Sequence, residues 1–147
     1  MKREAIIKII IEEQKVVIES LQKSVEQYKI ASDLDEESTH DPEDFSHQTE
    51  AKDMQLRFEK TLKEAEASLT FLKGELKQNH DSIENGSLIE TDQNFLFVGI
   101  SVPVFEFEGK DVITFSENAP VFQNLRGKNI GELVEIGSNS LKILAFY

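Results

Sequence analysis

The chain has 147 residues, no cysteine and a formal net charge of −12 at pH 7. This length suits one ordinary domain, or a small domain joined to an extended element. The composition excludes a disulfide framework and a thiolate metal site, and the negative charge argues against nonspecific binding to nucleic acid, because nothing offsets repulsion by the phosphates.

The first expected element is a helix over residues 3–31, where no Gly or Pro interrupts the chain. Its apolar positions recur every three or four residues, which is typical of a heptad seam. The seam positions are Ile7, Ile10, Gln14, Val17, Leu21, Ser24 and Tyr28, and Ile11, Ile18 and Val25 widen the stripe. The isoleucine cluster at 6–11 contains Lys8 and is too short for a signal peptide or a membrane span, so we expect a cytoplasmic protein.

A second heptad-patterned helix is expected over residues 43–73 and its flanks. Its seam positions are Ala51, Gln55, Phe58, Leu62, Ala65, Leu69, Leu72 and Leu76. Neither helix buries its stripe alone, so antiparallel pairing within the chain is the economical solution, although an intermolecular bundle uses the same pattern. We therefore predict an N-terminal antiparallel coiled-coil hairpin over residues 1–80, and a monomer if the hairpin closes on itself.

An acidic loop is predicted between the two helices, at residues 33–44. It contains seven carboxylates and neither Lys nor Arg. Asp41 and Pro42 form a favourable helix start, so helix capping is one complete explanation for the acids around them. Asp41 and Asp44 also lie three residues apart on the seam face, where two carboxylates can share one Mg²⁺ with ligands from a partner. His40 and His47 match no common metal-ligand spacing, so we interpret them as solvated.

Residues 81–147 predict a separate module with the pattern of an antiparallel sheet, after a linker at 79–86. A hairpin turn is expected at 108–110 and a short helix at 119–126, with Gly127 following its end. The expected strands cover residues 95–100, 102–108, 112–115, 132–136 and 141–146, with a turn at 137–140. The fold class predicted for the whole chain is therefore α+β.

The segment 117–136, ENAPVFQNLRGKNIGELVEI, resembles the C-terminal domain signature of the Gre transcript-cleavage factors. That signature has Pro, a short helix ending in Leu, Gly-Lys, two residues, Gly and an acid before a strand. The matching residues here are Pro120, Leu125, Gly127, Lys128, Gly131 and Glu132. Together with an acid-tipped helical hairpin, the resemblance covers nearly the whole chain.

The resemblance implies a protein that enters the secondary channel of bacterial RNA polymerase. An FKBP-like C-terminal domain would dock at the channel rim, and the hairpin would carry Asp41 and Asp44 to a Mg²⁺ shared with the polymerase. The residues implied in docking are Pro120, Leu125, Arg126, Gly127 and Lys128. The chain would have no cofactor of its own, no sequence-specific DNA binding and no enzymatic activity alone, and would stimulate RNA cleavage by the polymerase or modulate elongation.

The tip departs from the Gre pattern, because the usual Gly-Asp-Leu-Ser-Glu-Asn run is absent. Residues 41–50, DPEDFSHQTE, instead resemble the tip of DksA, a regulator of initiation, although Ser46 replaces an Ala and the DksA zinc cysteines are missing. An initiation regulator, or an inhibitor that blocks the channel without cleavage, is therefore the alternative within this class. A coiled-coil adaptor or an FKBP-like chaperone is the alternative from another class.

Overall fold

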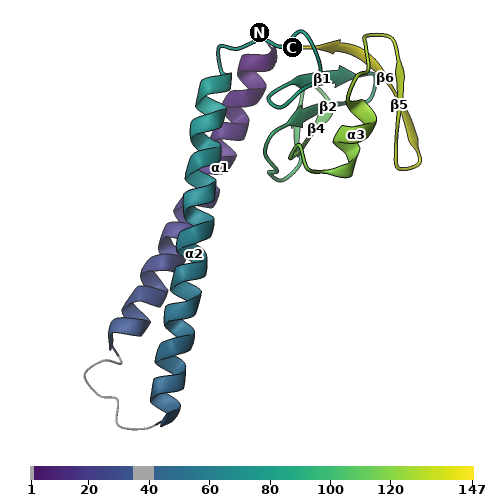
Figure 1. The fold of residues 1–147 in the computed structure, drawn as a ribbon. Coiled ribbons are helices and arrows are strands. Elements are labelled where there is room, and N and C mark those ends of the chain that lie inside the picture. The colour runs from purple at the N-terminus through teal and green to yellow at the C-terminus, as the bar shows by residue number, and fades with distance from the viewer. Residues whose placement is uncertain (1, 35–41) are drawn as a thin grey trace. The chain divides into compact units, whose positions relative to one another are not determined.

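In the computed structural model, the backbone is described for residues 2–34 and 42–147, and side chains for residues 2–31 and 49–147. The chain is mixed α+β, with two long helices followed by a six-stranded sheet and one short helix (Figure 1). It forms two compact units, one of residues 14–70 and the other of residues 1–13 together with 71–147. Each described helix lacks a stretch long and apolar enough to cross a membrane.

The helical unit, residues 14–70, consists of the larger parts of α1 (Lys2–Leu34) and α2 (Pro42–Glu75). The two helices contact each other through polar and aromatic side chains. Gln14 Nε2 donates to the main-chain oxygen of Ala65 at 3.0 Å, and the rings of Tyr28 and Phe58 stack with centroids 5.4 Å apart. A seam glutamine is thus buried with its donor satisfied by the other helix.

Burial along the helices corrects one detail of the predicted seam. Val17, predicted to lie on the seam, is 38 % exposed, whereas Ile18, predicted only to widen it, is 8 % exposed. At this point the buried stripe of α1 therefore passes through Ile18 and not through Val17. Helix α1 continues to Leu34, so residues 33 and 34 of the predicted loop are helical, whereas α2 begins at Pro42, the predicted helix start.

The second unit contains a sheet with the strand order β3-β4-β2-β1-β6-β5. Its strands are β1 (Leu88–Thr91), β2 (Asn94–Val98), β3 (Phe105–Phe107), β4 (Lys110–Phe115), β5 (Leu133–Ile136) and β6 (Asn139–Phe146). Strand β1 was not predicted, because its four residues are all buried and show no alternation. The prediction of a purely antiparallel sheet was wrong, since β2 and β4 pair in parallel.

The parallel pair arises because residues 99–104 do not form the predicted strand. The main-chain N–H of Val102 donates to Thr114 Oγ1 at 2.7 Å, and Thr114 Oγ1 donates to the main-chain oxygen of Val102 at 3.1 Å. This side chain satisfies the backbone that a neighbouring strand would otherwise pair. The chain then returns as β3, which pairs with β4 at the sheet edge and leaves β4 between β3 and β2.

The turns of this unit largely follow the predicted turn residues. Glu108 and Gly109 have φ values of 52° and 81° and connect Phe107 to its partner Lys110, as a two-residue hairpin requires. The predicted turn at 137–140 is shorter, because Ile136 pairs with Asn139 and leaves only two residues between the strands.

The short helix α3 (Pro120–Leu125) packs on the sheet. The core cluster comprises Ile83, Ile89, Leu96, Val98, Phe115, Phe122, Leu125, Val134 and Ile143. Phe122 and Leu125 are the buried residues of α3. Because they anchor the helix in the core, the residues that follow Leu125 have a defined position at the surface.

Candidate functional site

The tip residues predicted to act on a metal lie largely outside the described part of the chain. Asp41 and His40 are among the residues whose placement is not described. Asp44 and His47 are within α2, but their side chains are not described. In the part of the chain that is described, no group of three or more His, Asp or Glu side chains is arranged to hold a metal ion. The tip site therefore stays a prediction.

The predicted docking segment comprises α3 and the residues that directly follow it. Pro120 is at the first turn of the helix, and Arg126 follows its last residue. Gly127 has φ of 82°, a conformation that favours glycine, and the N–H of Lys128 donates to the main-chain oxygen of Leu125 at 3.1 Å. Leu125 itself is fully buried, so it positions this segment and does not reach the surface.

Two further residues, Ile130 and Leu133, extend this segment into what we call the cationic face, defined as Arg126, Lys128, Ile130 and Leu133. Arg126, Lys128 and Leu133 line one groove, and Ile130 follows Lys128 by two residues. Ile130 and Leu133 are 61 % and 62 % exposed. The sequence analysis missed Ile130 and Leu133, although the apolar Ile130 between turn residues was a signal.

A shallow groove of about 710 Å³ lies at the cationic face, and Arg126, Lys128 and Leu133 are part of its wall. Within the described residues, the side chains of Arg126, Lys128 and Lys142 have no carboxylate within ion-pair distance. Glu135 also lines the groove, so the face carries more positive than negative charge but is not purely basic. Residues 81–147 contain ten acidic and four basic residues, and two of those four, Arg126 and Lys128, lie here.

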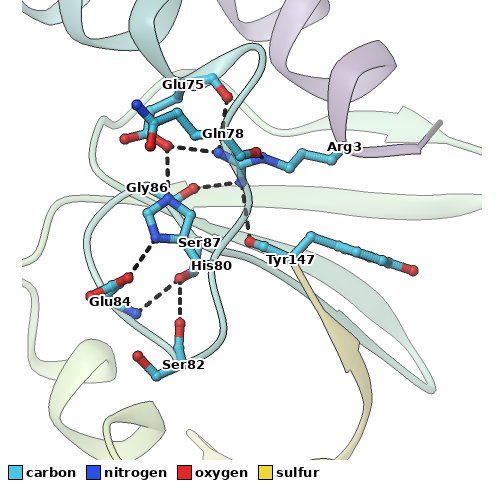
Figure 2. A network of polar contacts seen from close by, with 9 residues as sticks. All are labelled: Arg3, Glu75, Gln78, His80, Ser82, Glu84, Gly86, Ser87 and Tyr147. Atoms are coloured by element: carbon cyan, nitrogen blue, oxygen red, sulfur yellow. Dashed lines mark hydrogen bonds and ion pairs between the residues drawn. The ribbon is translucent and has the colours of Figure 1, made fainter.

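Arg3, a residue of α1 that the sequence analysis did not single out, is buried and hydrogen-bonded, unlike the cations of the cationic face. Its side chain is 5 % exposed, and its guanidinium group donates five hydrogen bonds (Figure 2). The acceptors are the main-chain oxygens of Gln78 (2.6 Å), Gly86 (2.7 Å), Glu75 (3.0 Å) and Tyr147 (3.2 Å) and the Oε2 atom of Glu75 (2.7 Å). We call Arg3 and these four acceptor residues the Arg3 network.

The Arg3 network joins four parts of the chain within one compact unit: the start of α1, the end of α2, the segment 78–86 and the end of β6. A planar guanidinium with five donors suits this site, whereas an ammonium could not reach all the acceptors. The predicted linker at 79–86 is therefore held by hydrogen bonds, although it is neither helix nor strand.

His80 extends this network through two carboxylates (Figure 2). Its Nε2 atom lies 2.8 Å from Glu75 Oε2, and its Nδ1 atom lies 2.7 Å from Glu84 Oε1. Burial lowers the pKa of His80, but the hydrogen bonds to Glu75 and Glu84 outweigh it, and the net pKa is above its usual value of 6.5.

A second group of charges ties α1 to the sheet. Lys2 Nζ lies 3.2 Å from Glu90 Oε1, and Lys110 Nζ lies 3.3 Å from Glu90 Oε2. Both ammonium groups also lie over the ring of Phe95, at 5.9 and 5.5 Å from its centroid. Lys2 Nζ also lies 3.6 Å from Glu108 Oε2, so two ammonium groups face two carboxylates and the group has the character of a structural ion-pair cluster.

Comparison with known proteins gives no match: no protein-family model, no curated protein and no solved structure corresponds to this chain.

Proposed function

We propose that this chain is a bacterial transcription factor of the Gre type that binds RNA polymerase through its secondary channel. The observation that carries the proposal is the cationic face, which contains both basic residues of the Gre-like segment, Arg126 and Lys128. Their charges have no partner within the described part of the chain, and two exposed apolar side chains, Ile130 and Leu133, lie with them. Exposed aliphatic side chains beside unpaired cations favour a protein partner with an acidic surface.

In this proposal the helices over residues 1–80 form an antiparallel coiled-coil hairpin, and residues 81–147 form an FKBP-like domain. The domain docks at the channel rim through the cationic face. Asp41 and Asp44 at the tip then share the catalytic Mg²⁺ of the polymerase, which performs the chemistry. The protein works in the cytoplasm as a monomer, with no cofactor of its own, and modulates elongation or stimulates cleavage of backtracked RNA.

Binding to the cognate polymerase core tests the docking step. We expect Arg126→Glu/Lys128→Glu to weaken the complex by about 100-fold, since two attractive charges become repulsive at an interface. The control is Lys142→Glu, which reverses a charge at an exposed position of the same compact unit that does not line the groove. Equal affinities for the wild type, the double variant and the control would contradict docking through the cationic face.

A regulator of initiation similar to DksA, or an inhibitor that blocks the channel, is the alternative within this class. The DksA-like residues of the tip support it, because they place acids near the metal without the Gre sequence. Asp41→Ala separates the possibilities. A cleavage factor loses its stimulation of RNA cleavage, whereas a steric inhibitor keeps its inhibition of transcription.

An FKBP-like chaperone is the alternative from another class, and it needs an apolar pocket lined by aromatic side chains. Phe95, Phe97, Phe115 and Phe122 are instead buried, with exposures of 1, 0, 8 and 8 %. The groove at the cationic face and a cavity of about 420 Å³ beside Arg3 contain no phenylalanine in their walls. A peptide prolyl-isomerisation assay tests this activity directly. A coiled-coil adaptor predicts instead that the polymerase is not bound at all.

A further inference from the structure

We propose that His80 is a proton-dependent latch, which ties Glu84 and its turn to Glu75 at the end of α2 only while its imidazole ring is protonated. The proposal concerns a single compact unit and does not depend on the function proposed above. It stands on the positions of both ring nitrogens, each of which faces a carboxylate oxygen (Figure 2).

The geometry requires two donors on the ring. A carboxylate oxygen accepts hydrogen bonds, and a neutral imidazole has only one N–H to donate. Loss of the proton would therefore place a ring lone pair against either Glu75 or Glu84, at a distance of 2.8 or 2.7 Å. Only 10 % of the His80 side chain is exposed, so water is poorly placed to screen that repulsion.

The two carboxylates are not equivalent, and this decides which contact would break. Glu75 is 12 % exposed and is also held by Arg3, at 2.7 Å from its Oε2 atom. Glu84 is 55 % exposed, and His80 is the one partner of its carboxylate among the described residues. Glu75 therefore keeps its position through Arg3, and deprotonation of His80 releases Glu84.

The release of Glu84 affects the turn that it starts. The main-chain N–H of Glu84 donates to Ser87 Oγ at 2.9 Å, and Ser87 Oγ donates to the main-chain oxygen of Ser82 at 2.9 Å. Ile83, within this turn, is 5 % exposed and belongs to the core cluster of the sheet. The charge on His80 thus supports the packing of the turn against the sheet.

The charged groups that face His80 are Arg3 from α1, Glu75 from α2 and Glu84 from its own segment. Burial and the nearby charge of Arg3 lower the pKa of His80, but the two carboxylates together raise it by more, so the protonated ring is favoured. Because the pKa of His80 is raised on folding, its stabilisation is complete below the unfolded pKa of about 6.5. It is lost as the pH rises through the folded pKa. The latch is therefore closed at acidic pH and opens towards alkaline pH.

The experiment is an NMR titration of the full chain with amide hydrogen exchange measured in parallel. The reporters are the amides of Glu84, Gly86 and Ser87, whose N–H groups are hydrogen-bonded in the structure, and the reference is Gly131, bonded to Ile143 at 2.8 Å. After correction for base-catalysed exchange, we expect the reporters to lose protection about tenfold, or about 1.4 kcal/mol, across the His80 titration. Protection at Gly131 should remain unchanged.

Two variants and one control keep the test decisive. In His80→Gln the pH-dependent loss of protection should disappear. In Glu84→Gln the side-chain amide can donate to a neutral ring, so the pKa of His80 should fall relative to wild type even if His80→Gln does not fold. His40→Gln/His47→Gln removes the other two histidines and should retain the wild-type pH dependence. A His80 pKa at or below 6.5, an unchanged pKa in Glu84→Gln, or pH-independent protection of the reporters would overturn the proposal.

Discussion

Arg3 and Arg126 belong to the same compact unit and are the same residue type, yet their surroundings are opposite. Arg3 is buried and donates five hydrogen bonds within the chain. Arg126 is exposed, lines a groove and has no ion-pair partner in the described part of the chain. Charge that is satisfied internally stabilises the fold, whereas charge left unsatisfied beside exposed apolar side chains is available to a partner.

Removal of the buried guanidinium group of Arg3 tests the difference between the two arginines most directly. Arg3→Met should lower the free energy of unfolding by about 3 kcal/mol, because Glu75 and several main-chain oxygens lose their donors while buried. Denaturant unfolding measures the change. Arg126→Met is the matched control and should change the free energy of unfolding by less than about 0.5 kcal/mol. Similar losses in both variants would mean that the two arginines do not differ as described.

Two glycines test the same difference, because Gly86 is hydrogen-bonded to Arg3 and Gly127 follows Arg126. Gly86 has φ of 97°, and a Cβ there would lie 2.6 Å from Cδ of Glu75, which Arg3 holds in place. Gly127 has φ of 82° but no atom within 4 Å of such a Cβ. We expect Gly86→Ala to cost about 2–3 kcal/mol and Gly127→Ala about 1 kcal/mol in thermal or denaturant unfolding. Equal costs would show that the contact with Glu75 contributes nothing.

The smallest expected effect concerns the apolar part of the cationic face. Leu133→Ser should leave the free energy of unfolding within about 0.5 kcal/mol of wild type, because the side chain is 62 % exposed. Its affinity for polymerase should nevertheless fall about tenfold. Val104→Ser, at a residue that is 58 % exposed before edge strand β3, is the control and should keep wild-type affinity. A Leu133→Ser variant with unchanged affinity would remove this residue from the docking surface.

Local sequence signals predicted the elements whose structure is decided locally. The turn at Glu108 and Gly109 and the helix beginning at Pro120 were expected from residue types with restricted or unusual φ values. The burial of Gln55 and Ala65 on α2 likewise follows from heptad spacing. In each case, the residues that decide the conformation are neighbours in the sequence.

Interactions between distant residues could not be predicted in this way. The parallel pairing of β2 and β4 depends on Thr114, which replaces a strand as the partner of Val102. The Arg3 network depends on main-chain oxygens from residues as far away as Tyr147, and main-chain atoms leave no signal in the residue types. For the same reason, the sequence marked Arg126 and Lys128 but not Leu133, which lines the same groove only because β5 lies beside α3.

The most direct test of the central claim is RNA cleavage in backtracked elongation complexes of the cognate polymerase. The proteins compared are the wild type, Asp41→Ala/Asp44→Ala, and Asp53→Ala/Glu66→Ala, which removes the same charge from exposed positions of α2. The account predicts shortened transcripts with the wild type and the control, and none with the tip variant, although all three bind the polymerase. No shortening by bound wild-type protein, or equal shortening by the tip variant, would contradict it.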